Sequence, residues 1–352
     1  MSEGISRRDF LKIAVLGAVS PRLLAACAGD EGPSVNFFNW SSYIAKDTLP
    51  NFTKKTGIRV NYNVYADEEE MYAKLRSGAL EYDVIMGADF MISRLRALNL
   101  IERIPSGSLK NRVNLMPIFR HPPYDPHEEF TAPYLWGTTG IGYNKKRLPK
   151  SPSSWRDLWN ADFAGRISML DNARDCISVA LLLLGISEST SNEADFDQAK
   201  DLLLKQKPLV RSYTSSNYVD DLISGEIWLG MAWSGDILQA IKENPDLDYV
   251  VPREGAYRWV DNLCLVRGAP HKEEALRLMD YLLEARVAAD IASAVRYATP
   301  NKAALAYLAP SLLKDPRIYP PPSVEKRLRF NVQLDSVQMQ QWNEIWSEIK
   351  VS

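Results

Sequence analysis

The chain has 352 residues, of which 46% are hydrophobic and 24% charged, and its formal net charge is −2. These values are typical of a globular protein, and the length is enough for two domains. The mildly acidic balance argues against a nucleic-acid-binding protein, which needs a basic surface. It is compatible with a cationic ligand.

The first 26 residues are predicted to be a signal peptide of the twin-arginine type. Residues 7–12 (Arg-Arg-Asp-Phe-Leu-Lys) resemble the twin-arginine motif, and residues 13–19 form an apolar run. A bilayer-spanning helix needs about 20 apolar residues, so this run is too short to be one. We therefore expect export from the cytoplasm, by the twin-arginine route or alternatively by the Sec route.

The signal peptide is predicted to end in a lipid-attachment site. Residues 24–27 (Leu-Ala-Ala-Cys) resemble a lipobox, in which the cysteine, here Cys27, receives a diacylglycerol. Residues 27–34 would be the lipidated cysteine and a tether. Cleavage before Cys27 removes four basic and two acidic residues from the 42 and 44 of the whole chain, leaving 326 residues with a formal charge of −4. The protein is expected at the cell exterior or in the periplasm, anchored to a membrane.

Cysteine and histidine content gives little sign of cross-links or metals. Apart from Cys27, only Cys176 and Cys264 are present. A disulfide is conceivable in an oxidising compartment, but we interpret both as small buried apolar side chains. His121 and His127 lie in a proline-containing segment that is predicted to be an exposed loop, so we expect no metal site there.

The body of the chain alternates between predicted strands and helices, which is typical of βαβ units and a mostly parallel sheet. The segments of the first half are expected as strands over 35–39, 58–65 and 82–86, and as helices over 47–56 and 67–76. A second set of units begins near Ile141. Its segments are expected as helices over 155–159, 177–184, 194–205, 234–242, 272–284 and 287–295, and as strands over 166–170, 227–233, 247–251 and 259–266. The last strand is expected to return to the first domain, so strands would join two lobes.

Aromatic and acidic residues follow several of the predicted strands. These residues are Trp40 and Tyr43, Asp89 and Phe90, Asp171 and Asp175, and Trp233 and Asp236. Ligands of open α/β sheets bind at the carboxyl ends of the strands. Carboxylates bind ammonium groups, and each aromatic face adds about 0.5–2 kcal/mol of attraction for a cation. The pattern indicates a site for an organic cation, although a single Asp can equally be a helix N-cap and a single ring can belong to the core.

Catalytic motifs are absent from the sequence. It contains no Gly-x-Ser-x-Gly elbow, no phosphate-binding glycine loop and no His-Glu-x-x-His zinc motif. Paired carboxylates could serve a glycosidase, but nothing selects one as the acid and another as the nucleophile. We expect no enzymatic activity and no cofactor, with an exported hydrolase as the least favoured alternative.

Six segments resemble the periplasmic spermidine/putrescine-binding proteins. They are 38–43 (FNWSSY), 82–85 (YDVI), 133–144 (PYLWGTTGIGYN), 230–236 (GMAWSGD), 297–301 (YATPN) and 318–321 (IYPP). The resemblance runs from about Val35 to Lys350. It implies an α/β, two-lobed periplasmic-binding-protein fold, in which each lobe has a mixed, mostly parallel sheet flanked by helices and the ligand lies in the interlobe cleft. Lobe 1 would comprise 35–138 and 262–303, and lobe 2 would comprise 139–261 and 304–352.

The resemblance also implies the residues of the site. Ammonium groups would be bound by Asp175, Asp236 and Asp261, and Ser41 would add a polar contact. The aromatic box would consist of Trp40, Tyr43, Trp233, Trp259 and Tyr297, and Phe90 would stand where the family often has Tyr or Ser. A further contact near Gln333 is conceivable.

Two departures from the family concern the ligand. Ser42 and Asn172 stand where the family has acids. Putrescine, spermidine and a less cationic relative therefore all remain open as ligands.

The resulting hypothesis is a monomeric, non-catalytic lipoprotein that binds a polyamine and delivers it to the permease subunits of an ABC importer. The alternatives are a polyamine-sensing partner of a membrane signalling protein and a binding protein for another organic cation.

Overall fold

The computed structural model describes residues 32–65, 68–78 and 81–352. The predicted signal peptide, the predicted lipidation site Cys27 and residues 28–31 of the predicted tether lie outside the described residues. No helix of the described part is long and apolar enough to cross a membrane.

Ten strands of the described part form one continuous sheet, with the order β2-β1-β3-β9-β4-β7-β5-β6, while β10 pairs with β9 and β8 with β4. The strands are β1 Ser34–Trp40, β2 Arg59–Tyr65, β3 Val84–Ala88, β4 Thr131–Asn144, β5 Ile167–Met169, β6 Val210–Tyr213, β7 Leu229–Trp233, β8 Leu247–Val250, β9 Ala256–Leu265 and β10 Leu328–Phe330. Strand β1 pairs in parallel with β2 and β3, and β5 pairs in parallel with β6 and β7. Parallel pairing within each half agrees with the βαβ units that the sequence predicts.

Buried side chains form two separate hydrophobic cores, and these define the two lobes used below. The lobe 1 helices are α1 Thr48–Thr56, α2 Glu68–Ser77, α3 Ile92–Ala97, α8 Lys272–Leu282, α9 Ala285–Val295 and α10 Pro310–Leu313. The lobe 2 helices are α4 Ala173–Leu184, α5 Glu193–Gln206, α6 Tyr218–Ser224, α7 Ser234–Ala240 and α12 Ser336–Val351, and the short α11 spans Pro322–Glu325. The expected α/β architecture with two lobes is confirmed.

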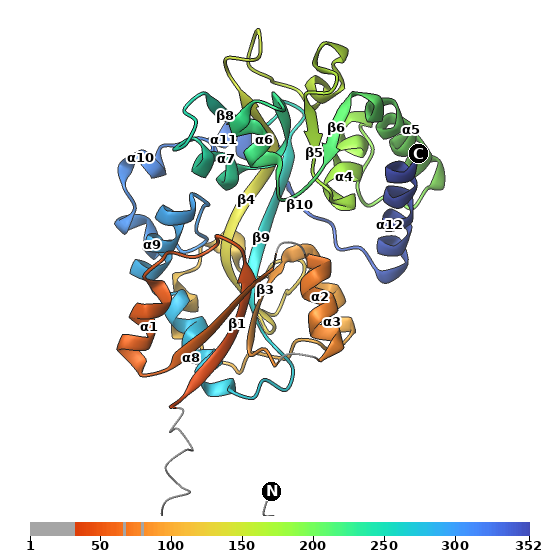
Figure 1. Ribbon diagram of the computed structural model, residues 1–352. Coiled ribbons are helices and arrows are strands. Elements are labelled where there is room, and N and C mark those ends of the chain that lie inside the picture. The colour runs from red at the N-terminus through yellow and green to blue at the C-terminus, as the bar shows by residue number, and fades with distance from the viewer. Residues whose placement is uncertain (1–31, 66–67, 79–80) are drawn as a thin grey trace, which may run out of the picture.

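Two long strands, β4 and β9, run from one lobe into the other (Figure 1). Residues 131–138 of β4 pair in antiparallel orientation with residues 258–264 of β9. The end of β9 pairs with β3 of lobe 1, whereas residues 139–143 of β4 pair with β7 of lobe 2. The predicted return of the chain to lobe 1 through the strand near 259–266 is therefore confirmed, and the connection between the lobes consists of paired strands.

The lobe boundaries that the resemblance implies stay a prediction, and one segment packs differently from the expectation. Residues 304–352 were expected in lobe 2. However, Ala304, Leu308, Leu312 and Ile318 pack in the core of lobe 1. Only the last part of this segment, with Trp342 and Trp346 of α12, packs in the core of lobe 2.

Helix α4 begins four residues earlier than the sequence predicts. The side chain of Asn172 accepts a hydrogen bond of 3.1 Å from the backbone N–H of Asp175, which makes Asn172 the N-cap. Asp175 was expected in a loop, but it lies in the first turn of the helix. Its carboxylate is thus close to the positive end of the helix dipole.

The two cysteines of the described part are free and buried, which confirms their interpretation as apolar side chains. Cys264 packs in the core of lobe 1 and Cys176 in the core of lobe 2, so they are not neighbours.

Candidate functional site

A cleft with a volume of about 470 Å³ is lined by residues of both lobes. All ten site residues that the resemblance implies line it: Trp40, Ser41, Tyr43, Phe90, Asp175, Trp233, Asp236, Trp259, Asp261 and Tyr297. Ser42 and Asn172, the two departures from the family pattern, line it as well. The structure thus brings the predicted set together, while the ligand-binding role of each residue stays a prediction.

The topology explains why these side chains meet. Strand β1 ends at Trp40 and β7 ends at Trp233, and helix α7 begins directly after β7. Strands β1 and β7 run in opposite directions, because three antiparallel pairings, β3 with β9, β9 with β4 and β4 with β7, lie between them in the sheet. The carboxyl end of β1 in lobe 1 and that of β7 in lobe 2 therefore face each other across the cleft, and ligands of α/β sheets bind at such ends. The loop after β1 turns through Ser42, whose φ is 54°. The hydroxyl of Ser41 donates a 3.0 Å hydrogen bond to the carbonyl of Tyr65, which fixes this loop to the end of β2.

Asp261 is the acid of the predicted set that lies on the lobe 1 side, at the point where β9 faces β3. It is buried, and the Tyr43 hydroxyl donates a 2.6 Å hydrogen bond to its Oδ2. Burial raises the pKa of Asp261 to about 7, although the hydrogen bond from Tyr43 acts in the opposite direction. The carbonyl of Tyr43 is bound in turn by the Tyr134 hydroxyl at 2.9 Å, so the tyrosine is held in position.

Asp236 lies in the first turn of α7 and accepts a hydrogen bond at each carboxylate oxygen. Tyr218 donates to Oδ2 at 2.6 Å and Tyr297 donates to Oδ1 at 2.5 Å. Burial raises the pKa of Asp236, and the two tyrosine hydroxyls partly oppose that rise. A carboxylate held in this way presents its remaining lone pairs to the cleft in a fixed direction.

Asp175 is the third acid of the predicted set. The Thr139 hydroxyl donates a 3.0 Å hydrogen bond to its Oδ1. Burial raises the pKa of Asp175 to about 6, which the bond from Thr139 opposes. Asn172, beside it, uses its side-chain oxygen as the N-cap of α4 and therefore has a structural role in place of an acid.

Aromatic rings line the cleft from both lobes. The rings of Trp40 and Trp233 have centroids 6.4 Å apart and are tilted by 57°. Tyr297 contacts two other rings edge-on, with centroid distances of 5.2 Å to Trp259 and 5.4 Å to Tyr43. Such faces attract a cation and pack against its methylene groups.

Acidic side chains outnumber basic ones on the lining of the cleft. The acids on its lining are Glu68, Asp171, Asp175, Asp220, Asp236, Glu243 and Asp261. The only base on the lining, within the described part of the chain, is Arg174. Arg174 already forms a 2.9 Å ion pair with the buried Glu188, and Asp171 is paired with Lys350 at 2.9 Å. A cleft of this composition favours a cationic ligand.

Some residues of the cleft were not predicted to belong to it. The acids Glu68, Asp220 and Glu243 line it, and so does Asn331. Acids at the start of a helix are favoured by the helix dipole, so Glu68, in the acidic start of α2, was interpreted as part of the helix and not of a site. Asn331 lies two residues before Gln333, near which a contact was expected; Gln333 instead accepts a 2.9 Å hydrogen bond from Ser93.

Asp89 was noted in the sequence because it follows a strand, but it does not reach the cleft. It is fully buried, and its Oδ1 accepts hydrogen bonds from Asn331 at 3.0 Å and from the backbone of Phe90 at 2.9 Å. Burial raises the pKa of Asp89 to about 7, against the hydrogen bond from Asn331. Phe90, the next residue, lines the cleft.

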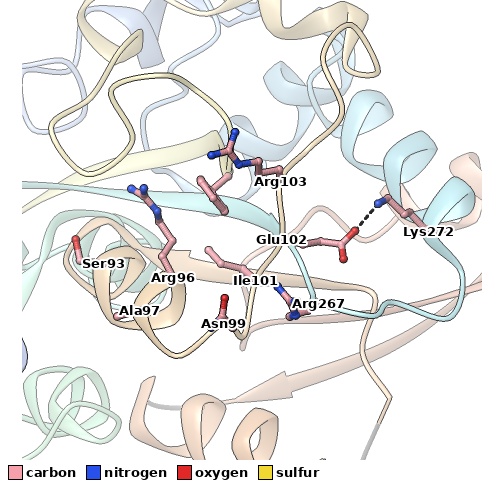
Figure 2. Close-up of a pocket in the computed structure, with 10 residues that line it drawn as sticks. Ser93, Arg96, Ala97, Asn99, Ile101, Glu102, Arg103, Arg267 and Lys272 are labelled. Atoms are coloured by element: carbon pink, nitrogen blue, oxygen red, sulfur yellow. Dashed lines mark ion pairs between the residues drawn. The ribbon is translucent and has the colours of Figure 1, made fainter.

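A second cavity, of about 730 Å³, lies on the surface of lobe 1 and has the opposite charge (Figure 2). Arg96, Arg103, Arg267 and Lys272 line it, together with one acid, Glu102. Glu102 forms a 2.5 Å ion pair with Lys272. The excess of positive charge repels an organic cation, so the interlobe cleft is the better candidate site for one.

The described residues contain no group of three or more His, Cys, Asp or Glu side chains placed to hold a metal ion.

Comparison with known proteins agrees with this geometry. Residues 80–315 match the family model described as bacterial extracellular solute-binding protein. The chain is 36% identical over 301 residues to the spermidine/putrescine-binding periplasmic protein of Escherichia coli (strain K12), an alignment that covers 84% of this chain and 86% of the relative. It is 31% identical over 361 residues to the putrescine-binding periplasmic protein PotF of the same organism, with 94% and 97% covered. The crystal structure of the spermidine/putrescine ABC transporter substrate-binding protein PotD from Streptococcus pneumoniae has a TM-score of 0.81 and 27% identity, and covers 91% of this chain and 99% of its own.

Proposed function

Because the chain belongs to the family of bacterial extracellular solute-binding proteins, we propose that it binds a polyamine, putrescine or spermidine, between its lobes and delivers it to an ABC importer. It acts as a binding protein and not as an enzyme. The relatives whose names state a ligand are spermidine/putrescine-binding and putrescine-binding proteins, and they align over most of this chain.

The composition of the interlobe cleft supports the proposal: the described residues that line it include seven acids, one base and six aromatic side chains. Carboxylates form charge-assisted hydrogen bonds with ammonium groups, and the aromatic faces cover the methylene groups between them. A sugar would leave the carboxylates without cationic partners, and an amino acid would add to its one ammonium group a carboxylate that these acids repel.

Binding is proposed to close the lobes on the ligand. Asp261 and Tyr43 contact the cleft from lobe 1, and Asp175 and Asp236 contact it from lobe 2. A ligand that reaches acids of both lobes binds the closed form more tightly than the open form and therefore shifts the equilibrium toward closure. Strands β4 and β9, which pass between the lobes, are the segments that would bend.

Transport requires a place outside the cytoplasm, and the predicted lipid on Cys27 would supply the anchor. A tethered receptor stays close to its transporter at a high effective concentration. Incorporation of labelled palmitate into the expressed protein, and its loss in Cys27→Ser, tests this part of the proposal. A wild-type protein that takes up no label would contradict the anchor but not the ligand.

The proposed ligand class is tested by a thermal-shift screen with polyamines, amino acids and sugars. A ligand that binds only the folded state at 100 times its Kd adds about 2.7 kcal/mol of stability. We expect putrescine or spermidine to raise the unfolding temperature, and the sugars and the amino acids without a basic side chain to leave it unchanged. A shift with another organic cation but with no polyamine would contradict the proposed ligand and keep the cation site.

A further inference from the structure

Glu68 has a buried carboxylate in the cleft, and one of its two oxygens accepts no hydrogen bond. It is the first residue of α2, it is 9% exposed, and it lines the cleft. Its Oε1 accepts a 2.9 Å hydrogen bond from the backbone N–H of Ala88. Its Oε2 is buried and has no hydrogen-bond partner. A buried polar atom without a partner is unfavourable, and in a binding cleft it indicates a place for a ligand donor.

The carboxylate of Glu68 lies at the same end of β3 as Asp261. Ala88, whose N–H binds Glu68, is the residue of β3 directly opposite Asp261 of β9 in the antiparallel register. Burial raises the pKa of Glu68, and the charge of Asp261 is the next largest cause. The two carboxylates are therefore close enough to repel each other when both are ionised.

Nothing within the described part of the chain neutralises this pair. None of its ion pairs involves Glu68 or Asp261. The groups that act on the pair from the surrounding elements are the hydroxyls of Tyr43 and Tyr65, the indole of Trp40, the acids Glu69 and Asp89, and more distantly Arg174, which acts on Asp89. The acids among them add negative charge, so the place between Glu68 and Asp261 lacks a cation.

We propose that Glu68 and Asp261 together bind one ammonium group of the ligand at the lobe 1 end of the cleft. The proposal rests on the proposed polyamine-binding function and adds a binding residue to it. An ammonium group carries several N–H donors, so it can reach the free Oε2 of Glu68 and the carboxylate of Asp261 at once. It also supplies the positive charge that the pair lacks.

A consequence is that ligand binding releases a proton. Burial and the charge of Asp261 raise the pKa of Glu68, and burial raises that of Asp261 to about 7, so near neutral pH the ligand-free pair carries less than two negative charges. An ammonium group between the two carboxylates favours their ionised forms and so displaces the proton that remains on the pair. Binding is therefore tighter at pH 8 than at pH 6, where the proton competes with the ligand.

The Glu68→Gln variant separates ligand binding from a structural role. The amide oxygen of Gln can still accept the bond from Ala88, but its NH₂ group cannot accept a bond from an ammonium group. We expect at least tenfold weaker binding of putrescine and spermidine in calorimetric titrations, with no loss of stability in the ligand-free protein. Titrations in buffers of different ionisation enthalpy should show proton release by the wild type and a smaller release by the variant. The matched control is Glu273→Gln, at an exposed position of α8 in the same lobe and outside the cleft, which should bind as the wild type does.

A double-mutant cycle tests whether the two acids bind the same ammonium group. If they do, Glu68→Gln combined with Asp261→Asn weakens binding by clearly less than the product of the two single effects. Unchanged affinity in Glu68→Gln, or strictly independent effects in the cycle, would overturn the proposal and leave the proposed function intact. A wild-type protein that binds no polyamine would instead contradict the proposed function itself.

Discussion

The hydroxyl of Tyr297, which packs in the core of lobe 1, donates a 2.5 Å hydrogen bond to Oδ1 of Asp236 on α7 in lobe 2. One acid of the cleft is thus positioned by a residue of the opposite lobe. The same tyrosine ring packs edge-on against Trp259, so it connects the acidic and the aromatic parts of the site.

The Tyr297→Phe variant keeps the ring but removes this hydrogen bond. Asp236 would then retain only the donor Tyr218. Hydrogen bonds to buried charged groups contribute about 1.5–3 kcal/mol, so we expect a lower free energy of unfolding in urea denaturation and weaker polyamine binding. Tyr307→Phe, at an exposed position, is the control. Equal unfolding midpoints for Tyr297→Phe and the wild type would show that the bond contributes nothing.

The Asp261→Asn variant removes a charge at the lobe 1 end of the cleft while keeping the size of the side chain. We expect polyamine binding to weaken at least tenfold, which corresponds to about 1.4 kcal/mol. Calorimetric titration measures the change. Asp162→Asn, which removes an exposed acid far from the cleft in sequence, should leave the affinity as it is. An unaltered affinity in Asp261→Asn would remove this residue from the site.

Stability without ligand should fall as the pH rises from about 5 to 8. Burial raises the pKa values of Asp89 and Asp261 to about 7 and that of Asp175 to about 6, above the value near 4 of an unfolded chain. In this range the folded state binds more protons than the unfolded state, so stability decreases with pH. The acids with lowered pKa values, such as Glu254, change the free energy of unfolding only at pH values below this range.

Urea midpoints of the ligand-free protein at pH 5.5 and pH 8 measure this dependence. The Asp261→Asn variant should reduce the difference between the two midpoints, because one of the contributing acids is gone. Midpoints that rise toward pH 8 would contradict the assignment of these acids as buried without cationic partners.

The Gly137→Ala variant tests the aromatic side of the cleft without changing any charge. A Cβ at this position of β4 would lie 2.7 Å from Cη2 of Trp259 and 3.0 Å from Cδ1 of Tyr297. Both rings would have to move, and overpacking of this kind costs about 1–3 kcal/mol. We expect weaker polyamine binding and an altered tryptophan fluorescence response to the ligand. Gly32→Ala, whose Cβ meets nothing within 4 Å, is the control. Equal polyamine affinities of Gly137→Ala and the wild type would mean that Trp259 does not contact the ligand.

Much of the fold was predictable because hydrophobic periodicity and helix signals are local. Helix α1 ends at Gly57, which has the left-handed φ of 76° expected of a C-cap glycine. The long strand β4 was not predicted as an element because Gly137, Gly140 and Gly142 interrupt its pattern. In the structure a Cβ at any of these three positions would collide with a side chain that is distant in sequence. Only glycine therefore fits there, and the sequence alone does not show this.

The candidate site was predictable where strands end in aromatic or acidic residues and the family pattern could be matched. Glu68 could not be found in this way, because only the pairing of β3 with β9 brings Asp261 close to the start of α2. Asp175 was placed in a loop, since the sequence alone does not show that Asn172 caps the helix earlier.

Binding of a polyamine in the cleft is tested most directly by calorimetric titration of the purified protein at pH 8. The titrants are putrescine, spermidine and 1,4-butanediol, which has the length of putrescine but no charge. If the carboxylates and aromatic rings together bind ammonium groups, at least one polyamine binds saturably and the diol shows no detectable binding. If neither polyamine binds, or if putrescine and the diol bind equally, the proposed polyamine site is contradicted.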